Sequence, residues 1–181
     1  MAVSRGTAGE PLVVTARLEL WLPTMHDIAP LRTITADPAT RRHLPGQSPV
    51  DHFQRFLRNA GSWQLYGYGA FMLRERSSGE LIGDVGVFRS LRGLGDGFDD
   101  VPEAGWVLRA DRVGQGLARE AMEAALAWFE REHGRQRIVC MIAPANAPSI
   151  GLAGRLGFLP LREARMPDGG ETVRLFERLP G

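Results

Sequence analysis

The residues with the clearest chemical potential lie between positions 109 and 121, in a turn that precedes an amphipathic helix. Gly114, Gly116 and Ala118 place small side chains at alternate positions, so a ligand can approach the backbone closely. The first N–H groups of a helix have no partner inside it, and the helix dipole adds about half a positive charge at that end. Together they favour an anion, and the sequence therefore predicts a site for a phosphate-bearing cofactor.

Two familiar phosphate-binding motifs are absent from this turn. All 22 basic residues are arginines, so the lysine of a Walker-type loop is missing, as is any lysine for Schiff-base chemistry. The pair Gly114 and Gly116 lacks the third glycine of a dinucleotide fingerprint, and no acidic residue closes the next strand near Ile142. The turn therefore predicts neither a Walker-type nucleotide site nor a Rossmann site.

Composition excludes several other kinds of site. Cys140 is the single cysteine, which excludes an internal disulfide and a Cys-based zinc site, and its apolar neighbours predict a core position in a buried strand. The four histidines follow no metal-ligand spacing, so we predict no metal and read them as surface or packing residues: His26, His43, His52 and His133. A net charge of +1 gives no electrostatic case for a nucleic-acid partner.

The chain is predicted to form one domain with no membrane segment. Its 181 residues, 44% of them hydrophobic, suffice for a sizeable core. No apolar run approaches the roughly 18 residues of a membrane span. Residues 1–11 lack the apolar centre of a signal peptide, so we expect a flexible tail there, a domain over 12–181 and a cytoplasmic location.

Hydrophobic periodicity predicts seven strands and four helices along the chain. Strand-like patterns cover residues 12–22, 66–75, 80–91, 103–108, 137–142, 158–165 and 171–179. Helical spacing with start and stop signals covers residues 24–36, 48–60, 114–133 and 146–156. This order predicts an α/β (α+β) fold with a mixed sheet.

Four motifs in this order resemble the GNAT superfamily of acyl-CoA N-acyltransferases. They are Thr-Ala-Arg-Leu-Glu-Leu at 15–20, Gly-Glu-Leu-Ile-Gly-Asp-Val-Gly-Val at 79–87, the Gly-x-Gly-x-Ala turn, and the Asn-x-x-Ser to Leu-Gly-Phe helix at 146–158. The chain looks closest to the ribosomal-protein N-terminal alanine and serine acetyltransferases. The resemblance implies a single GNAT domain with a mixed, mostly antiparallel sheet of about seven strands, splayed at its centre and flanked by about four helices.

The resemblance also implies acetyl-CoA as the cofactor, held between strands 103–108 and 137–142 where they separate at a bulge. Backbone N–H groups of the turn would bind the pyrophosphate: Val113, Gly114, Gly116, Leu117 and Ala118. Trp106, Val107 and Leu108 would line the acyl end from the first strand. Arg109, Arg112 and Arg119 crowd the same turn, where they either pair with coenzyme phosphates or remain solvated surface arginines.

Acyl transfer to an amine requires a neutral amine, a donor for the carbonyl oxygen and a proton for the leaving thiolate. By resemblance, Glu103 would deprotonate the amine through water, and N–H groups near Val107 and Leu108 would bind the oxygen. Many family members use a Tyr for the thiolate, but this position is Ala153. Ser149 would replace it and Asn146 would bind the pantetheine arm. Each candidate has a structural alternative, an exposed strand-end carboxylate for Glu103 and helix caps for Asn146 and Ser149.

The acceptor site is less visible in the sequence. The loop before strand 103–108 concentrates Asp96, Asp99 and Asp100, which would favour a cationic acceptor unless they only face solvent. Three aromatic residues near the second helix would line the pocket or pack in the core: Trp63, Tyr66 and Tyr68.

The function predicted from these features is acetyl-CoA-dependent N-acetylation of a primary amine, most like a protein N-terminal α-amine, by direct attack on the thioester. Acetylation of a small-molecule amine such as a polyamine or an aminoglycoside is the alternative within enzymes. A non-catalytic acyl-CoA-binding module is the alternative of another class. The expected state is a monomer or a homodimer, with no nucleic-acid or membrane partner.

Overall fold

The computed structural model describes residues 9–44, 48–167 and 170–181. The predicted tail at 1–11 lies outside the described residues except for its last three. The connection between the predicted strands 158–165 and 171–179 lies partly outside them as well. All statements below concern the described residues.

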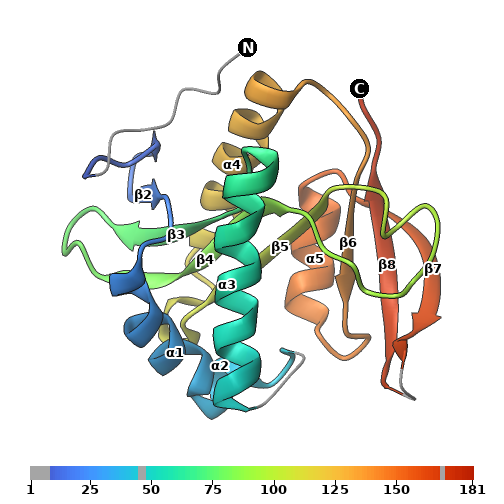
Figure 1. Cartoon of the computed structure of the whole chain (residues 1–181), viewed down its shortest axis with the longest axis horizontal. Coiled ribbons are helices and arrows are strands. Elements are labelled where there is room, and N and C mark those ends of the chain that lie inside the picture. Colours follow the sequence, from blue (N-terminus) through green and yellow to red (C-terminus); the bar gives the residue numbers. More distant parts are fainter. Residues whose placement is uncertain (1–8, 45–47, 168–169) are drawn as a thin grey trace.

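A single mixed sheet of eight strands runs through the molecule (Figure 1). Its strands are β1 (Val13–Val14), β2 (Leu18–Trp21), β3 (Ala70–Glu75), β4 (Leu81–Phe88), β5 (Glu103–Leu108), β6 (Ile138–Ile142), β7 (Leu159–Arg165) and β8 (Thr172–Arg178). They follow the spatial order β1-β2-β3-β4-β5-β6-β8-β7. Neighbours in the described sheet are antiparallel except β5 and β6, which are parallel.

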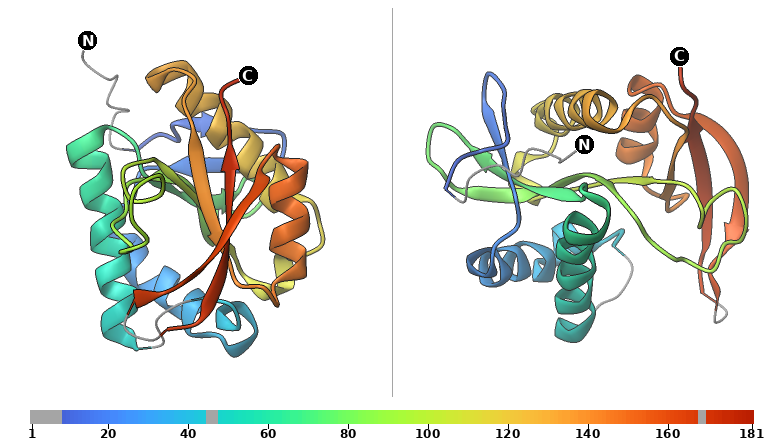
Figure 2. Two further views of the ribbon diagram at one scale, coloured as in Figure 1. Left: turned by 90° about the vertical axis from the view of Figure 1, so that its right-hand side faces the viewer. Right: turned by 45° about the horizontal axis from the view of Figure 1, so that its top comes forward.

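Helices cover both faces of this sheet. They are α1 (Ile28–Ala36), α2 (Pro38–Arg41), α3 (Pro49–Tyr66), α4 (Leu117–His133) and α5 (Ala147–Arg155), with short 3-10 turns at Met25–Asp27 and Ala110–Arg112. Figure 2 shows α1 and α3 on one face and α4 and α5 on the other. The chain thus forms the predicted α/β domain, with one strand and one helix more than the sequence pattern indicated.

Alternation along β3 explains the two layers. Phe71 and Leu73 belong to the main core, which includes the apolar stripe of α4 around Met122 and Phe129, whereas Met72 packs in a second cluster with Phe56 of α3. Because successive side chains of a strand point to opposite faces, one strand supplies both cores. The sheet is therefore buried on both sides at its centre.

Two of the differences from the predicted element boundaries have a clear physical cause. The helix expected to end near residue 60 continues to Tyr66 and ends at Gly67, whose φ of 76° lets its N–H donate to Trp63 O at 3.2 Å. Ser62 explains the extension, because its buried hydroxyl donates to Tyr68 O at 2.7 Å and holds the last turn on the sheet. The strand expected over 12–22 is divided at Thr15, whose N–H donates to Leu18 O at 2.9 Å in a tight turn.

Candidate functional site

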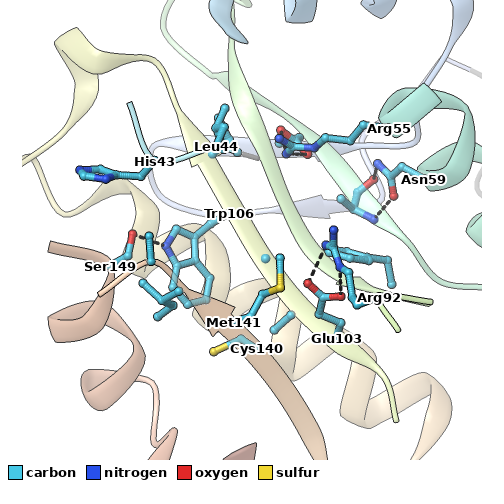
Figure 3. A pocket seen from close by; sticks show the side chains of 18 of the residues that line it. His43, Leu44, Arg55, Asn59, Arg92, Glu103, Trp106, Cys140, Met141 and Ser149 are labelled. Atoms are coloured by element: carbon cyan, nitrogen blue, oxygen red, sulfur yellow. Dashed lines mark hydrogen bonds and ion pairs between the residues drawn. The ribbon is translucent and has the colours of Figure 1, made fainter. Parts of the chain in front are cut away.

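A cavity of about 310 Å³ opens where β5 and β6 separate (Figure 3). The two strands pair at Glu103 and Val139, and beyond that point their described residues no longer pair. The cavity is lined by residues 103–107 of β5, residues 140–142 of β6, the start of α5 and one side of α3. The bulge expected at the separation is not seen in the β4–β5 register, which runs unshifted from Gly83 and Leu108 to Phe88 and Glu103.

Every second backbone N–H group of β5 points toward this cavity. Arg109 N–H donates to Ile82 O on the β4 side at 2.8 Å, and on the β6 side Pro102 O accepts from Val139 N–H at 2.9 Å. Because N–H and C=O directions alternate along a strand, the N–H groups of Trp106 and Leu108 point toward the gap. By the same alternation Val107, expected to share this role, directs its N–H to β4.

The predicted anion turn has an open backbone cradle at the start of α4. Gly114 and Gly116 have φ values of 84° and 77°, and a Cβ built on Gly114 would meet nothing within 4 Å. The N–H of Val113 donates to Ala110 O at 3.2 Å and is therefore not available to a phosphate. The four other predicted donors have no backbone acceptor in the described chain: Gly114, Gly116, Leu117 and Ala118. This geometry fits the pyrophosphate of coenzyme A.

The three arginines predicted to pair with phosphates are engaged with carboxylates. Arg109 bonds Glu80 and Asp111, and these bonds raise its pKa further. Arg112 bonds Glu75 and Asp111, and Arg119 pairs with Glu123 one helical turn away. The side chains of Arg109 and Arg112 thus brace the turn against the β3–β4 hairpin, and any phosphate contact by the three arginines stays a prediction.

Arg17 is a neighbour of the cradle that the sequence analysis missed. Its Nη1 donates to Gln115 O at 3.0 Å, and its Nη2 lies 3.6 Å from a Cβ built on Gly116. Glu120 holds it through a 2.7 Å ion pair and also accepts a hydrogen bond from Thr15. Burial alone would raise the pKa of Glu120, but the hydrogen bonds from Thr15 and Arg17 together lower it below its usual value.

Asn146 and Ser149 both line the cavity at the start of α5. Asn146 caps the helix, its Oδ1 accepting from Ser149 N–H at 3.2 Å. The Ser149 hydroxyl oxygen accepts from the indole N–H of Trp106 at 3.2 Å, so the two side chains point toward one another across the opening (Figure 3). Capping explains the asparagine, while the serine hydroxyl hydrogen remains available to a ligand.

Glu103 lies on the other side of the cavity as a buried carboxylate rather than an exposed strand end. Its side chain is 4% exposed, and Arg92 bonds it twice, Nε to Oε2 at 2.9 Å and Nη2 to Oε1 at 2.8 Å (Figure 3). Ser90 also donates to Oε2. An ionised carboxylate has about four lone-pair sites, so Oε1 retains one for an amine or a water.

The acidic loop does not reach the cavity, contrary to the expectation from its charge. Phe98 at its centre is 1% exposed and packs with Val139 and Leu175, which draws the loop over β6 and β8. The carboxylates of Asp99 and Asp100 accept from backbone N–H groups of the same loop, and Asp96 is exposed. None of the three carboxylates lines the cavity, because burial of the Phe98 ring fixes the loop over β6 and β8.

The three predicted aromatic residues are also absent from the cavity wall. Trp63 packs edge-on against Phe71 and donates its indole N–H to Ala70 O at 2.9 Å. Tyr68 is buried against Phe129, with ring centroids 4.9 Å apart, and Tyr66 is exposed beside it. Core and rim packing, the alternative considered for these residues, is their role in the structure.

Arginines of α3 form part of the cavity lining. Arg55 donates to both oxygens of the buried Asp84, at 3.0 and 2.9 Å, and Arg58 follows one turn later. Asn59 anchors the helix through hydrogen bonds to the backbone of Ala70, and His43 marks the outer rim. The acid in the otherwise apolar strand 81–88 was the one sequence signal for this wall.

Cys140 is a core residue, as predicted, although it also contributes to the cavity lining. Burial raises the pKa of its thiol. Within the described ranges, no three His, Cys, Asp or Glu side chains gather closely enough to hold a metal ion. No described helix has the length and apolar character required to cross a bilayer.

The chain is similar to known proteins in sequence and in structure. A family model described as "Acetyltransferase (GNAT) domain" matches residues 17–159. A GnaT-family acetyltransferase from Bordetella pertussis has a TM-score of 0.80 and 36% identity, over 92% of this chain and 98% of the other. An acetyltransferase from Agrobacterium tumefaciens has a TM-score of 0.78 and 25% identity, over 91% and 92%. A ribosomal L7/L12 α-N-protein acetyltransferase in complex with coenzyme A has a TM-score of 0.73 over 94% and 98%; its 16% identity makes this a likeness of fold.

Proposed function

Because the chain belongs to the GNAT acetyltransferase family, we propose that it transfers the acetyl group of acetyl-CoA to the α-amine of a protein or peptide N-terminus. The enzyme class and the use of acetyl-CoA follow from the family; the acceptor is the proposal. The observation that supports this proposal is the cavity between β5 and β6. Its lining brings together Ser149 of α5, Glu103 of β5 and the arginines of α3.

The residues present fit the coenzyme at two places. The N–H groups of Gly114, Gly116, Leu117 and Ala118 would hold the pyrophosphate, and the Asn146 side chain would contact the pantetheine arm. When bound, acetyl-CoA supplies an acetyl group activated as a thioester. Arg17 lies close enough to the glycine turn to add one positive charge beside the phosphates.

The acceptor amine would attack the thioester carbonyl directly. A C–N bond forms, the C–S bond breaks, and the proton lost by the amine leaves as the thiolate gains one. The N–H groups of Trp106 and Leu108 face the gap and are placed to stabilise the carbonyl oxygen as it gains charge. No covalent enzyme intermediate is required.

Glu103 would accept the proton that the amine loses, and Ser149 would donate a proton to the thiolate. The remaining lone pair on Glu103 Oε1 can accept from the amine or from a water that carries its proton away. Its ion pair with Arg92 fixes the position of the carboxylate, so Glu103 can also hold the amine in place. Ser149, with its oxygen oriented by Trp106, can direct its hydrogen at the sulfur.

Support for an α-amine acceptor comes from the motif resemblance and from the charge of the cavity. Of the three arginines in its lining, Arg55 and Arg92 are each paired with a buried carboxylate, so Arg58 is the described lining arginine whose charge would oppose polyamines and aminoglycosides, which carry several positive charges. A peptide N-terminus brings a single charged amine that becomes neutral before reaction. The small-polycation alternative therefore loses the support that the acidic loop gave it.

The test is thiol release from acetyl-CoA by the purified protein with a panel of peptides, small amines and polyamines. We expect turnover with peptides whose α-amine is free, acetylation at that amine by mass spectrometry, and none with the same peptides blocked at the N-terminus. Turnover confined to small amines would refute the peptide acceptor. Tight coenzyme binding without turnover on any acceptor would instead identify a non-catalytic module.

A further inference from the structure

The cavity contains one arginine without a carboxylate partner. Arg55 is paired with Asp84 and Arg92 with Glu103. Arg58 is also in the cavity lining, and no hydrogen bond or ion pair joins it to any residue that the structure describes. Glu103 acts on its charge electrostatically but does not form an ion pair with it.

The remaining carboxylate of the lining does not supply the missing partner. Asp51 lies two turns before Arg58 on α3, and its Oδ2 accepts from the N–H and the hydroxyl of Ser48 in the cap of the helix. The charges that act on Arg58 are those of Arg92, Glu103 and Arg55. The Arg58 side chain is exposed at the cavity, where partial desolvation and the two neighbouring arginines lower its pKa while Glu103 raises it.

An anionic ligand would supply the ion-pair partner that Arg58 lacks. A guanidinium presents parallel N–H donors that match a carboxylate or a phosphate, and such charge-assisted bonds are among the stronger polar contacts. Arg58 is held on a helix that two polar attachments fix to the sheet, Arg55 to Asp84 and Asn59 to Ala70. These attachments fix the part of the helix from which the Arg58 side chain extends at the cavity.

We propose that Arg58 binds an anionic group of the acceptor, a carboxylate or a phosphate carried beside the reacting amine. This inference rests on the proposed acetyl transfer and specifies the acceptor as an acid-bearing primary amine. The same chemistry is offered by a peptide with an acidic residue next to its N-terminus and by a free amino acid. Both would place the amine toward Glu103 and Ser149 while the anion meets Arg58.

Two acceptor pairs separate these sources. One pair is a peptide beginning Ser-Asp and its Ser-Asn counterpart; the other is free serine and serinamide. For each acceptor, kcat/KM is measured with the wild type, with Arg58→Gln and with Arg58→Lys. Because the ratio of wild type to variant is taken for one acceptor at a time, differences in the acceptors' own amine basicity cancel.

We expect Arg58→Gln to lower kcat/KM at least tenfold for the acidic member of the pair that the enzyme uses, and less than twofold for its neutral counterpart. Arg58→Lys should retain part of the difference because it keeps the charge. Arg155→Gln is the matched control, since this exposed arginine ends α5 and does not line the cavity. It should behave as wild type with every acceptor.

A second readout does not depend on turnover. Calorimetry measures binding of the N-acetylated Ser-Asp and Ser-Asn peptides, and of N-acetylserine and its amide, to the protein saturated with coenzyme A. Equal effects of Arg58→Gln on acidic and neutral partners, in rates and in binding, would overturn the proposal. Absent turnover with retained, Arg58-dependent binding of an acidic partner would refute the proposed function and leave the anion site standing.

Discussion

The pair formed by Arg92 and Glu103 allows a quantitative test of how the cavity is built. The carboxylate side chain is 4% exposed and the guanidinium 14%, so both groups are largely removed from solvent. Replacing Arg92 with Met keeps much of the side-chain volume and strands the carboxylate. Breaking a buried pair in this way costs about 3–5 kcal/mol.

The lower end of that range is expected here, about 3 kcal/mol, because Ser90 still donates to Glu103 and the cavity can admit water. For a chain of this size each kcal/mol lowers Tm by about 2–4 °C. Arg92→Met should therefore lower Tm by roughly 6–12 °C. Urea unfolding followed by circular dichroism measures the free energy, and calorimetry measures the Tm.

Two variants isolate the cause. Arg119→Met removes an exposed pair, with side chains 54% and 51% exposed, and should cost about 0.5 kcal/mol or less. The double variant Arg92→Met with Glu103→Leu removes both charges of this pair and should recover most of the loss. A loss below about 1 kcal/mol in the single variant, or no recovery in the double, would refute the reasoning that a stranded charge is responsible.

Three further outcomes follow from the coenzyme side of the cavity. Gly116→Val should weaken coenzyme A binding at least tenfold by calorimetry with an unchanged far-ultraviolet spectrum, because a side chain at a φ of 77° strains the cradle and occupies it; unchanged affinity would remove the turn from the site. Ser149→Ala should lower kcat at least tenfold with little change in coenzyme affinity, and wild-type turnover would exclude Ser149 from the mechanism. Glu120 has a lowered pKa in the folded protein, so its stabilising effect is present above the ordinary value of 4.5 and is lost as the pH falls through the folded value. The stability difference between wild type and Glu120→Gln should therefore shrink in acid urea titrations, and a difference independent of pH would contradict this.

The parts of the molecule that the sequence predicted are those set by local chemistry. The turn at Gly114 and Gly116 and the stop at Gly134 depend on backbone preferences of the residues themselves, and the structure has them where expected. Val113 was misjudged because its N–H is used inside the 3-10 turn before the helix, at Ala110. Such competition for a donor is not visible in spacing.

The acceptor wall depends on contacts between distant residues. Arg55 and Asp84 are 29 positions apart, and no pattern within α3 or β4 pairs them. The acidic loop was assigned to the acceptor from its charge, yet Phe98 determines where the loop lies. Burial of a ring at this position is worth about 1.5–3 kcal/mol, more than the solvated carboxylates gain from facing a ligand.

The attachment of α3 to the sheet has a consequence for how such enzymes diverge. Arg55, Asn59 and Ser62 join it through hydrogen bonds to Asp84 and to the backbone of β3 and the segment before it. In the proposed function the thioester is held by other elements, α4, β5 and α5. Substitutions confined to α3 would then change the molecules that are acetylated and leave the donor machinery unchanged, so a lineage could acquire new targets without first losing its chemistry.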